Sequence, residues 1–421
     1  MQVKISPSIC NGNITIPPSK SMAHRSIICA SLTNGKSTIK NIAYSQDILA
    51  TIEGMKKLGA KIEMKEDYVV IEGIKDFSSL QSKEIFCNES GSTLRFFIPI
   101  FSLCNKSITF TGKGRLLHRP QKVYEEVFHS QGLSFIQNHD GITIHESIKP
   151  GEFSIKGDVS SQFISGLLFS LPLLKEDSII HIIPPFESKS YVSLTLQMLE
   201  TFGVHAYFKD DTTIYIPGNQ SYHSCEYTIE GDYSQFAFFA VLGAIQNGLS
   251  ITGVSHESSQ GDKKILSILK DFGAIVKEIH HGYYIKHNVL HGCEIDLADC
   301  PDLGPILCVL AMYSPGNTRI YNAGRLRIKE SDRIAAMEEE LRKFGVDIHS
   351  TEDEIFIKGA ADYTCTDELN AHNDHRIVMA LSIALACSSS SQIIHDAQAI
   401  NKSYPAFFED FKKIHGKADT L

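Results

Sequence analysis

Seven basic side chains lie in or beside short polar segments that precede apolar stretches of the sequence. They are Lys20, Arg25, Arg119, Lys329, Arg333, Arg376 and Lys402. A lone Lys or Arg usually marks a solvated surface, but this chain has a formal net charge of −9. Arg pairs with planar anions through two parallel hydrogen bonds and Lys supplies a point charge. Seven cations at such positions therefore favour a site for a small molecule that carries several negative charges.

The segment RIKESDRIAAMEEELRKFG brings two of these cations together with an acid. Lys329 and Arg333 are four residues apart and would share one face of a helix. Glu330 would be turned from Lys329 by about 100° around the same helix. Such a run is ordinarily the start of a surface helix, so it supports a site only in combination with the other cations.

The cations are positioned by a feature that recurs along the chain, a short polar cluster followed by an apolar segment that predicts a buried helix. The clusters are PSKS, NESGST, DVSSQ, GDYSQ, DCPD and HNDH, and we mark them by Lys20, Ser90, Ser160, Asp232, Asp302 and Asp374. Successive markers are 70, 70, 72, 70 and 72 residues apart. The start of a helix attracts anions because its N–H groups lack partners. The alternative is that these residues are only helix caps, each worth ~1 kcal/mol.

A second feature repeats with the same period, a helix-like segment that ends in glycine. The glycines are Gly59, Gly132, Gly203, Gly273, Gly345 and Gly416, at separations of 73, 71, 70, 72 and 71 residues. We predict each glycine at the left-handed position that follows a helix. Alternating runs between the helices, such as SITFTG and EIFIKG, predict strands.

The repeats predict six α+β modules of about seventy residues, each with two helices and several strands. Six modules are too many for one core, so we expect two domains of three modules each. Residues 1–18 with 226–421 would form a lower domain, and residues 19–225 an upper domain. The two strands that cross between the domains would act as a hinge.

Composition excludes several classes of protein. The ten cysteines are scattered, with no Cys-x-x-Cys pair and no His at zinc spacing, which indicates a reducing compartment and no structural zinc. The negative net charge argues against nucleic-acid binding. The start, MQVKISPS, lacks the apolar core of a signal peptide, and no apolar run is long enough to cross a membrane. We expect a cytoplasmic protein that binds neither nucleic acid nor membrane.

Seven segments, in order along essentially the whole chain, carry a family resemblance. They are PSKSMAHRS, ESGSTLRFF, GKGRLLHRP, GDVSSQFISGLL, LRIKESDR, NDHRIVMALS and NKSYPAFFEDF. Together they resemble the 5-enolpyruvylshikimate-3-phosphate (EPSP) synthase family of enolpyruvyl transferases. The resemblance implies an α+β (α/β) fold, a two-domain inside-out barrel with three βαβαββ units in each domain and the active site in the cleft between them.

The resemblance also implies an activity. The enolpyruvyl group of phosphoenolpyruvate would pass to the 5-hydroxyl of shikimate 3-phosphate with release of phosphate, in the shikimate pathway of aromatic amino acid biosynthesis. It implies domains that close over the two substrates, with no metal and no organic cofactor. We expect the chain to act as a monomer.

Individual roles follow from the positions that match the family's motifs. Shikimate 3-phosphate would be held by Lys20, Ser21, Arg25, Ser160, Ser161, Gln162, Ser188, Tyr191, Asp302 and Lys329. Phosphoenolpyruvate would be held by Lys20, Gly91, Arg119, Gln162, Arg333, His375, Arg376 and Lys402. Glu89 and Arg325 stand where relatives often have Asn, and Glu89 would repel phosphoenolpyruvate unless a cation pairs with it.

The implied reaction needs a base and an acid, because the 5-hydroxyl loses a proton while the methylene carbon gains one. We assign Asp302 as the base, and Glu330 with Lys20 as the pair that handles protons at the methylene carbon and the leaving phosphate. Two other functions stay open. An enolpyruvyl transferase that uses UDP-N-acetylglucosamine would carry a reactive Cys in the loop GKGRLLHRP, which has none. A nonenzymatic repeat scaffold would explain the periodicity, but not Asp302 and Glu330 among seven cations.

Overall fold

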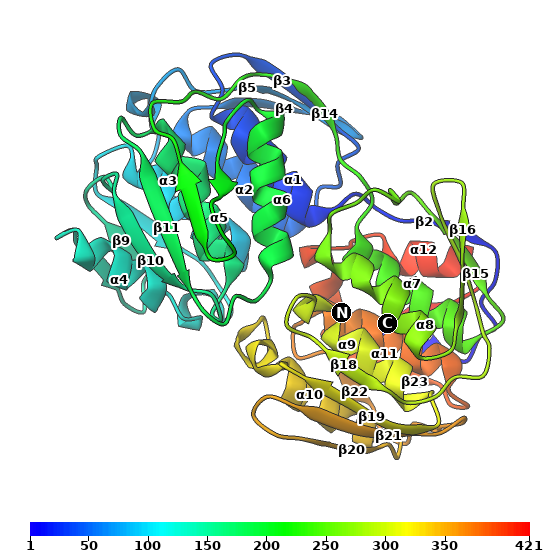
Figure 1. The fold of residues 1–421 in the computed structure, drawn as a ribbon. Helices are drawn as coiled ribbons and strands as arrows, with labels where there is room; N and C mark the ends of the chain where they lie inside the picture. The colour runs from blue at the N-terminus through cyan, green and yellow to red at the C-terminus, as the bar shows by residue number, and fades with distance from the viewer. The chain divides into compact units, whose positions relative to one another are not determined.

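The computed structural model describes residues 1–421 and divides into two compact units (Figure 1). Unit 1 comprises Met1–Pro17 and Glu230–Leu421, and unit 2 comprises Pro18–Ile229. These boundaries differ from the expected ones at Pro18 and at residues 226–229, which we had assigned to the lower domain. The later segment belongs to unit 2 because β14 (Glu226–Thr228) pairs with β3 (Lys36–Lys40) of that unit. None of the helices combines the length and the hydropathy that a membrane crossing requires.

Unit 2 contains three four-stranded sheets and six α-helices. The sheets have the orders β14-β3-β5-β4, β6-β7-β9-β8 and β10-β11-β13-β12. The remaining strands are β4 (Lys61–Met64), β5 (Tyr68–Glu72), β6 (Glu84–Phe86), β7 (Ile108–Thr111), β8 (Phe135–Gln137), β9 (Ile142–Ile144), β10 (Glu152–Lys156), β11 (Ser178–Ile183), β12 (Tyr207–Phe208) and β13 (Thr213–Ile216). The helices are α1 (Lys20–Ser31), α2 (Gln46–Leu58), α3 (Gly91–Ser102), α4 (Lys122–Ser130), α5 (Ser161–Ser170) and α6 (Lys189–Thr201).

Unit 1 has the same content. Its sheets have the orders β16-β17-β15-β2, β18-β19-β21-β20 and β22-β23-β1-β24. The strands are β1 (Val3–Ser6), β2 (Asn13–Thr15), β15 (Leu249–Thr252), β16 (Ile275–Ile279), β17 (Gly282–Lys286), β18 (Glu294–Asp296), β19 (Gly316–Tyr321), β20 (Asp347–Ser350), β21 (Ile355–Gly359), β22 (Leu369–Asn370), β23 (Gln392–His395) and β24 (Lys417–Thr420). The helices are α7 (Tyr233–Ile245), α8 (Ile265–Asp271), α9 (Gly304–Met312), α10 (Arg333–Arg342), α11 (His375–Cys387) and α12 (Phe407–Lys413).

All six sheets share one pattern, a parallel pair at one edge followed by two antiparallel pairings. In unit 2, β6 runs parallel to β7, and β9 is antiparallel to both β7 and β8. The last sheet of unit 1 is completed by the N-terminal strand β1, which pairs with β23 and β24. The predicted period of about seventy residues thus corresponds to a repeated four-stranded sheet with two helices.

The helices that follow the polar clusters are buried on nearly every side, as their mostly apolar sequences predict. In unit 1, α7, α9 and α11 pack against one another (Figure 1) and form the centre of one hydrophobic core. In unit 2, α1, α3 and α5 supply much of the second core. The starts of these central helices therefore form one end of each core, and the polar clusters lie there.

The helix ends largely follow the sequence. Ser90, Ser160, Asp232 and Asp374 each cap a helix by accepting a hydrogen bond from a backbone N–H of the first turn. Five of the six repeat glycines have positive φ. The prediction for Gly416 was wrong, because His415 takes the left-handed position with φ 70°. Gly416 is instead confined by packing, since a Cβ atom there would lie 2.4 Å from the ring of Phe411.

Candidate active site

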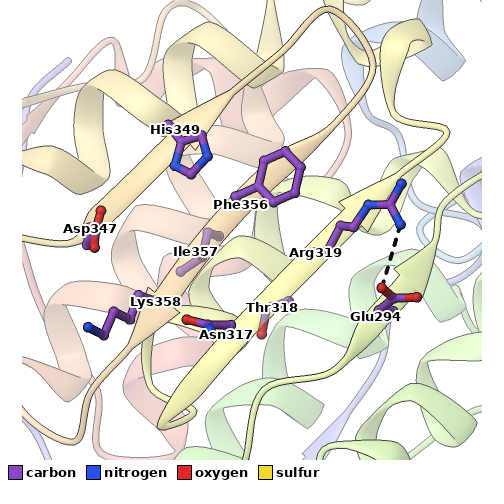
Figure 2. A pocket seen from close by; sticks show the side chains of 9 residues that line it. All are labelled: Glu294, Asn317, Thr318, Arg319, Asp347, His349, Phe356, Ile357 and Lys358. Carbon is purple, nitrogen blue, oxygen red and sulfur yellow. Dashed lines mark ion pairs between the residues drawn. The ribbon is translucent and has the colours of Figure 1, made fainter.

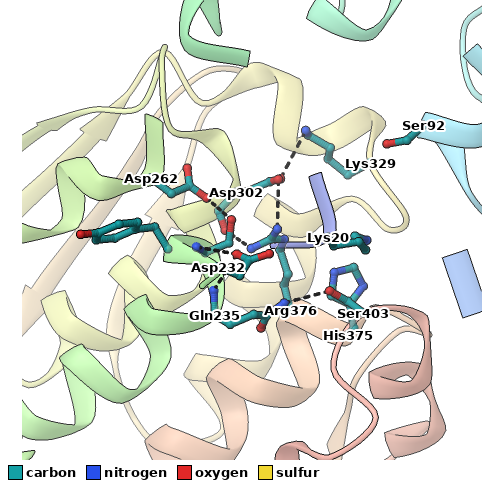
Figure 3. A network of polar contacts seen from close by, with 12 residues as sticks. Lys20, Ser92, Asp232, Gln235, Asp262, Asp302, Lys329, His375, Arg376 and Ser403 are labelled. Carbon is teal, nitrogen blue, oxygen red and sulfur yellow. Dashed lines mark hydrogen bonds and ion pairs between the residues drawn. The ribbon is translucent and has the colours of Figure 1, made fainter. Parts of the chain in front are cut away.

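Asp302 lies at the centre of a charged cluster in unit 1, in the 3₁₀ turn Pro301–Leu303 that leads into α9 (Figure 3). Its carboxylate accepts hydrogen bonds from Arg333 Nη1 at 3.1 Å, Arg376 Nη2 at 3.0 Å and Lys329 Nζ at 3.4 Å. Burial alone would raise the pKa of Asp302, but Arg376, Lys329 and Arg333 hold that pKa well below its usual range. Asp302 is therefore an anion at neutral pH.

Arg333, the first residue of α10, connects three carboxylates. Its Nε donates to Asp374 Oδ2 at 2.8 Å, and Nη2 donates to Glu330 Oε2 at 2.8 Å. Its side chain is 1% exposed. Burial lowers the pKa of a guanidinium, but Asp374, Glu330 and Asp302 raise the pKa of Arg333 above its usual value. Such a buried cation is tolerated because nearby carboxylates balance its charge and accept hydrogen bonds from its N–H groups.

The start of α11 joins the same cluster. Asp374 accepts a hydrogen bond from the backbone N–H of Arg376 at 2.9 Å, and Arg376 Nη1 donates to the backbone carbonyl of Asp302 at 3.1 Å. His375 is buried beside Asp374. Lys402 is buried and donates to the carbonyl of Asn373 at 2.6 Å. Seven of the predicted site residues belong to unit 1, and they lie in four short segments. Lys329, Glu330 and Arg333 lie at or just before the start of α10, Asp302 lies in the turn before α9, His375 and Arg376 begin α11, and Lys402 contacts Asn373.

Arg25 is the most enclosed predicted cation of unit 2. It lies on α1 with 3% exposure, and its guanidinium lies 5.3 Å from the ring centroid of Phe96. Its partners are the hydroxyl of Thr195 at 2.8 Å, the hydroxyl of Ser165 at 3.5 Å, and the carbonyls of Ser21 and Tyr191 at 2.8 and 3.1 Å. Burial lowers the pKa of Arg25 to about 10. Arg25 therefore stays positive at neutral pH, surrounded by neutral groups.

Lys20 begins α1 and forms an ion pair with Asp47, on the first turn of α2, at 2.8 Å. Gln162 and Ser160 lie at the start of α5, where Arg95 Nη1 contacts Gln162 Oε1 at 2.9 Å and Ser160 Oγ at 3.5 Å. Gln162 also donates to Ser92 Oγ at 2.8 Å. Unit 2 therefore brings polar groups from the starts of α3 and α5 together.

Gly91 and Arg119 are in direct contact. A Cβ atom built on Gly91 would lie 2.5 Å from Arg119 Nη1 and 3.6 Å from Gln162 Oε1. The absence of a side chain at Gly91 therefore lets the guanidinium of Arg119 lie against the start of α3. Ser161 opens α5, and Ser188 precedes α6, the helix that carries Tyr191. Glu89 lies against Gly114, where a Cβ atom would come within 2.7 Å of its carboxyl carbon.

Several polar residues of these clusters were missed by the sequence analysis. In unit 2 they include Arg95. Its position as a cation within the apolar part of the segment ESGSTLRFF could have identified it. In unit 1, Gln235 donates to Ser403 Oγ at 2.8 Å, and the polar cluster GDYSQ could have identified it. Asp262 approaches the same cluster (Figure 3), but its segment QGDKK gave no signal.

One group of side chains in unit 1 has the composition of a metal site. The ligand atoms of Glu339, Glu340 and His372 lie within 4.8 Å of one another. Lys343 Nζ already contacts both carboxylate oxygens of Glu340, at 3.0 and 2.9 Å, and the N–H of Asn370 donates to one of them at 2.9 Å. An internal cation therefore already neutralises Glu340, one of the three candidate ligands.

Two cavities within unit 1 are lined by none of the predicted site residues. A cavity of about 400 Å³ lies on the sheet that contains β19, β20 and β21, where His349 stacks on Phe356 and Arg319 contacts Glu294 at 3.6 Å (Figure 2). A second cavity, of about 690 Å³, is lined by Gln246, Tyr313 and Cys387, at the C-terminal ends of α7, α9 and α11. The charged cluster lies at the other ends of these helices, at the turn before α9 and at the start of α11.

Comparison with known proteins gives a consistent family. The model of the family "EPSP synthase (3-phosphoshikimate 1-carboxyvinyltransferase)" matches residues 6–411. A 3-phosphoshikimate 1-carboxyvinyltransferase of Clostridium perfringens is 46% identical over 418 residues, which cover 99% of this chain and 98% of that protein. A protein of the same name from Clostridioides difficile is 44% identical over 430 residues, with 99% and 98% coverage.

Solved structures agree at the level of the fold. EPSP synthase from Acinetobacter baumannii superposes with a TM-score of 0.80 at 24% identity and covers 100% of both chains. The enolpyruvyl transferase NikO from Streptomyces tendae superposes with a TM-score of 0.77 at 16% identity and covers 99% of this chain and 98% of its own. From the family model and the curated relatives, this chain belongs to the EPSP synthase (3-phosphoshikimate 1-carboxyvinyltransferase) family.

Proposed function

We propose that this protein is the transferase that moves the enolpyruvyl group of phosphoenolpyruvate to the 5-hydroxyl of shikimate 3-phosphate and releases phosphate. The observation that carries this proposal is the match to 3-phosphoshikimate 1-carboxyvinyltransferases over 99% of the chain at up to 46% identity. The reaction supplies the shikimate pathway of aromatic amino acid biosynthesis. Its two substrates carry two phosphates and two carboxylates between them, which suits the cations of the two units.

Shikimate 3-phosphate is assigned first to unit 2. Arg25, with its neutral partners, supplies a positive charge for the phosphate, and Ser160, Ser161, Ser188 and Tyr191 supply hydrogen bonds to phosphate and hydroxyl groups. Lys329 and Asp302 of unit 1 complete the binding of this substrate. Phosphoenolpyruvate is assigned to Lys20, Gly91, Arg119, Gln162, Arg333, His375, Arg376 and Lys402.

Asp302 is the proposed base for the 5-hydroxyl. In the free protein its pKa is held low by Arg376, Lys329 and Arg333 after burial has raised it, so it is ionised but weakly basic. The phosphate and carboxylate groups of the substrates would bind to the same three cations. Their binding weakens the hold of these cations on Asp302 and raises its affinity for a proton at the moment when the hydroxyl must lose one.

The remaining proton transfers are assigned to Glu330 and Lys20. As the 5-oxygen attacks the central carbon of phosphoenolpyruvate, the methylene carbon takes a proton and a tetrahedral ketal forms. In the second step the methyl carbon of the ketal returns a proton, the carbon–oxygen bond to phosphate breaks, and the enol ether is left on the shikimate ring. Glu330, held by Arg333 at 2.8 Å, and Lys20, held by Asp47 at 2.8 Å, are positioned by ion pairs within their own units.

We further propose that the units are the two domains of an inside-out barrel that close over the substrates. The chain passes between the units at Pro17–Pro18 and at Ile229–Glu230, and these two crossovers form the hinge. Small-angle X-ray scattering should show a smaller radius of gyration when shikimate 3-phosphate is added. An unchanged radius with saturating substrate would remove domain closure from the proposal.

The setting of the reaction is part of the proposal. Ten unpaired thiols suit a reducing cytoplasm, where phosphorylated substrates are also found. One chain carries both charged clusters, so a monomer is sufficient, and light scattering after size-exclusion chromatography measures its mass.

The decisive experiment measures phosphate release with both substrates and with each omitted in turn. We expect release only when both are present. The rival enolpyruvyl transferase activity is tested in the same assay by replacing shikimate 3-phosphate with UDP-N-acetylglucosamine. Turnover with the sugar nucleotide alone would transfer the assignment to that enzyme, and no turnover with either acceptor would favour the scaffold.

A further inference from the structure

Asp262 is a buried carboxyl group that no cation pairs with. It lies in the 3₁₀ turn Gly261–Lys264 before α8 and is 2% exposed. The hydroxyl of Ser234, on α7, donates to its Oδ2, whereas the buried Oδ1 has no hydrogen-bond partner. Buried carboxylates are normally paired with a cation or satisfied by several donors. The surroundings of Asp262 therefore suit a neutral carboxylic acid better than an anion.

The charged and titratable groups near Asp262 come from three other segments of unit 1. Asp302 and Arg376 approach from the 3₁₀ turn before α9 and from α11, Asp232 from the start of α7, and the thiol of Cys300 is also nearby. Arg376 is already engaged with Asp302 at 3.0 Å. An ionised Asp262 would thus add a third carboxylate, beside Asp232 and Asp302, to one buried region.

Burial, followed by the charge of Asp302, raises the pKa of Asp262 to about 7. Arg376 and the hydroxyl of Ser234 act in the opposite direction, and Asp232 adds to the increase. The pKa of Asp302 is lowered, so the pKa values of the two neighbouring carboxyl groups shift in opposite directions. The pKa of Asp302 is low because three cations surround it, whereas Asp262 pairs with no cation, so Asp262 is the carboxyl group that keeps a proton.

We infer that Asp262 is a positioning residue for the proposed reaction: it keeps its proton in the free protein, whereas the neighbouring Asp302 is ionised. The inference rests on the proposed function for its role in turnover, but not for the position of the proton. A neutral Asp262 adds no negative charge beside Arg376 when phosphoenolpyruvate arrives. Loss of the proton at higher pH gives Arg376 a competing carboxylate and weakens its hold on this substrate.

The first test compares the KM for phosphoenolpyruvate from pH 5.5 to 9 in the wild type and in Asp262→Asn. The amide is a neutral isostere, so the ratio of wild-type KM to variant KM should be constant well below pH 7 and then rise as Asp262 ionises, by no more than tenfold per pH unit for one proton. Using the ratio cancels the ionisation of the substrate itself. Asp271→Asn, at an exposed position of α8, is the matched control and should follow the wild type throughout.

The second test needs no turnover. A carboxyl group whose pKa is raised in the folded state, above about 4 in the unfolded chain, binds more protons when folded, so its contribution to stability falls as pH rises from about 4 to about 7. Asp262→Asn removes this loss. The difference in Tm between Asp262→Asn and the wild type should therefore increase in favour of the variant from pH 4 to 7 and level off above pH 7.

The outcomes separate this inference from the proposed function. If the wild type shows no turnover, the proposed enolpyruvyl transfer is refuted, but the Tm comparison still tests the protonation of Asp262. A Tm difference that does not change with pH would overturn the protonated state of Asp262. A KM ratio that stays flat, or a loss of activity in Asp262→Asn at every pH, would overturn the role of neutral Asp262 in the reaction.

Discussion

Arg333 in unit 1 and Arg25 in unit 2 are both buried arginines at the polar end of a hydrophobic core, but their surroundings are opposite. Arg333 contacts the carboxylates of Asp374, Glu330 and Asp302. Arg25 contacts two hydroxyls, two carbonyls and an aromatic ring. Carboxylates raise the pKa of Arg333 although burial opposes them, whereas burial lowers the pKa of Arg25 to about 10.

This difference indicates a division of labour. A buried cation with only neutral partners favours binding of an anion, because a bound phosphate supplies the negative charge that the protein does not place beside it. A cation among carboxylates is part of a balanced network, in which substrate binding redistributes charge and changes the basicity of each member. We therefore assign affinity for shikimate 3-phosphate mainly to Arg25, and proton transfer to the network around Asp302.

The largest effect is expected from Asp302→Asn. The amide keeps the shape of the side chain but cannot accept the hydroxyl proton, and general base catalysis typically contributes ~10²–10⁴-fold. The kcat in the phosphate-release assay should fall by a factor in that range. Asp347→Asn, on the exposed edge of β20, is the control, and a near-normal kcat in Asp302→Asn would remove this residue from the chemistry.

Arg333→Met tests the balanced network through stability. Removing the cation leaves three carboxylates without their shared partner, and breaking a buried ion pair in this way costs about 3–5 kcal/mol. Chemical denaturation should show a free energy of unfolding reduced by that amount. Arg319→Met removes a half-exposed ion pair on β19 and should change stability little. Equal stability of Arg333→Met and the wild type would contradict the network.

Arg25→Met is the counterpart in unit 2. It removes a charge that has only neutral partners, so the free energy of unfolding should fall far less than in Arg333→Met. The affinity for shikimate 3-phosphate, measured by calorimetry, should drop roughly tenfold to a hundredfold, as for loss of a charged hydrogen bond worth about 1.5–3 kcal/mol. Lys122→Met, at an exposed position of unit 2, should leave this affinity unchanged. Unfolding as severe as in Arg333→Met would refute the comparison.

The smallest effect is expected from Gly91→Ala. A methyl group 2.5 Å from Arg119 Nη1 must displace that guanidinium, so the KM for phosphoenolpyruvate should rise several-fold while Tm stays the same. The contact is isolated by a double-mutant cycle. In an Arg119→Ala background, Gly91→Ala should have no further effect on KM, and an additive effect would show that the contact is not the cause.

The helix starts and the repeated modules could be predicted from the sequence. The alternative interpretation of the polar clusters, as helix caps, holds at Ser90, Ser160, Asp232 and Asp374, because a cap depends on its own helix. It does not hold at Lys20 or Asp302, which do not cap a helix. The repeat predicted the recurring sheets and the buried helices between them. It failed at Gly416, where packing against Phe411 rather than backbone conformation requires the glycine.

Contacts between distant segments were not readable. Asp262 reaches the neighbourhood of Asp302 only because α7, α9 and α11 pack together, and nothing in QGDKK marks a buried carboxyl group. Arg95 meets Gln162 across 67 residues of sequence. The sequence suggested Arg333 as a ligand for phosphoenolpyruvate, but its place among three carboxylates depends on Asp374, 41 residues away.

The division of labour is tested most directly by the rate of phosphate release at limiting and at saturating shikimate 3-phosphate, measured for the wild type, Arg25→Met and Asp302→Asn. We predict that saturation restores Arg25→Met to within a few-fold of the wild-type rate and leaves Asp302→Asn slow. Recovery of Asp302→Asn at saturation, or failure of Arg25→Met to recover, would contradict the account.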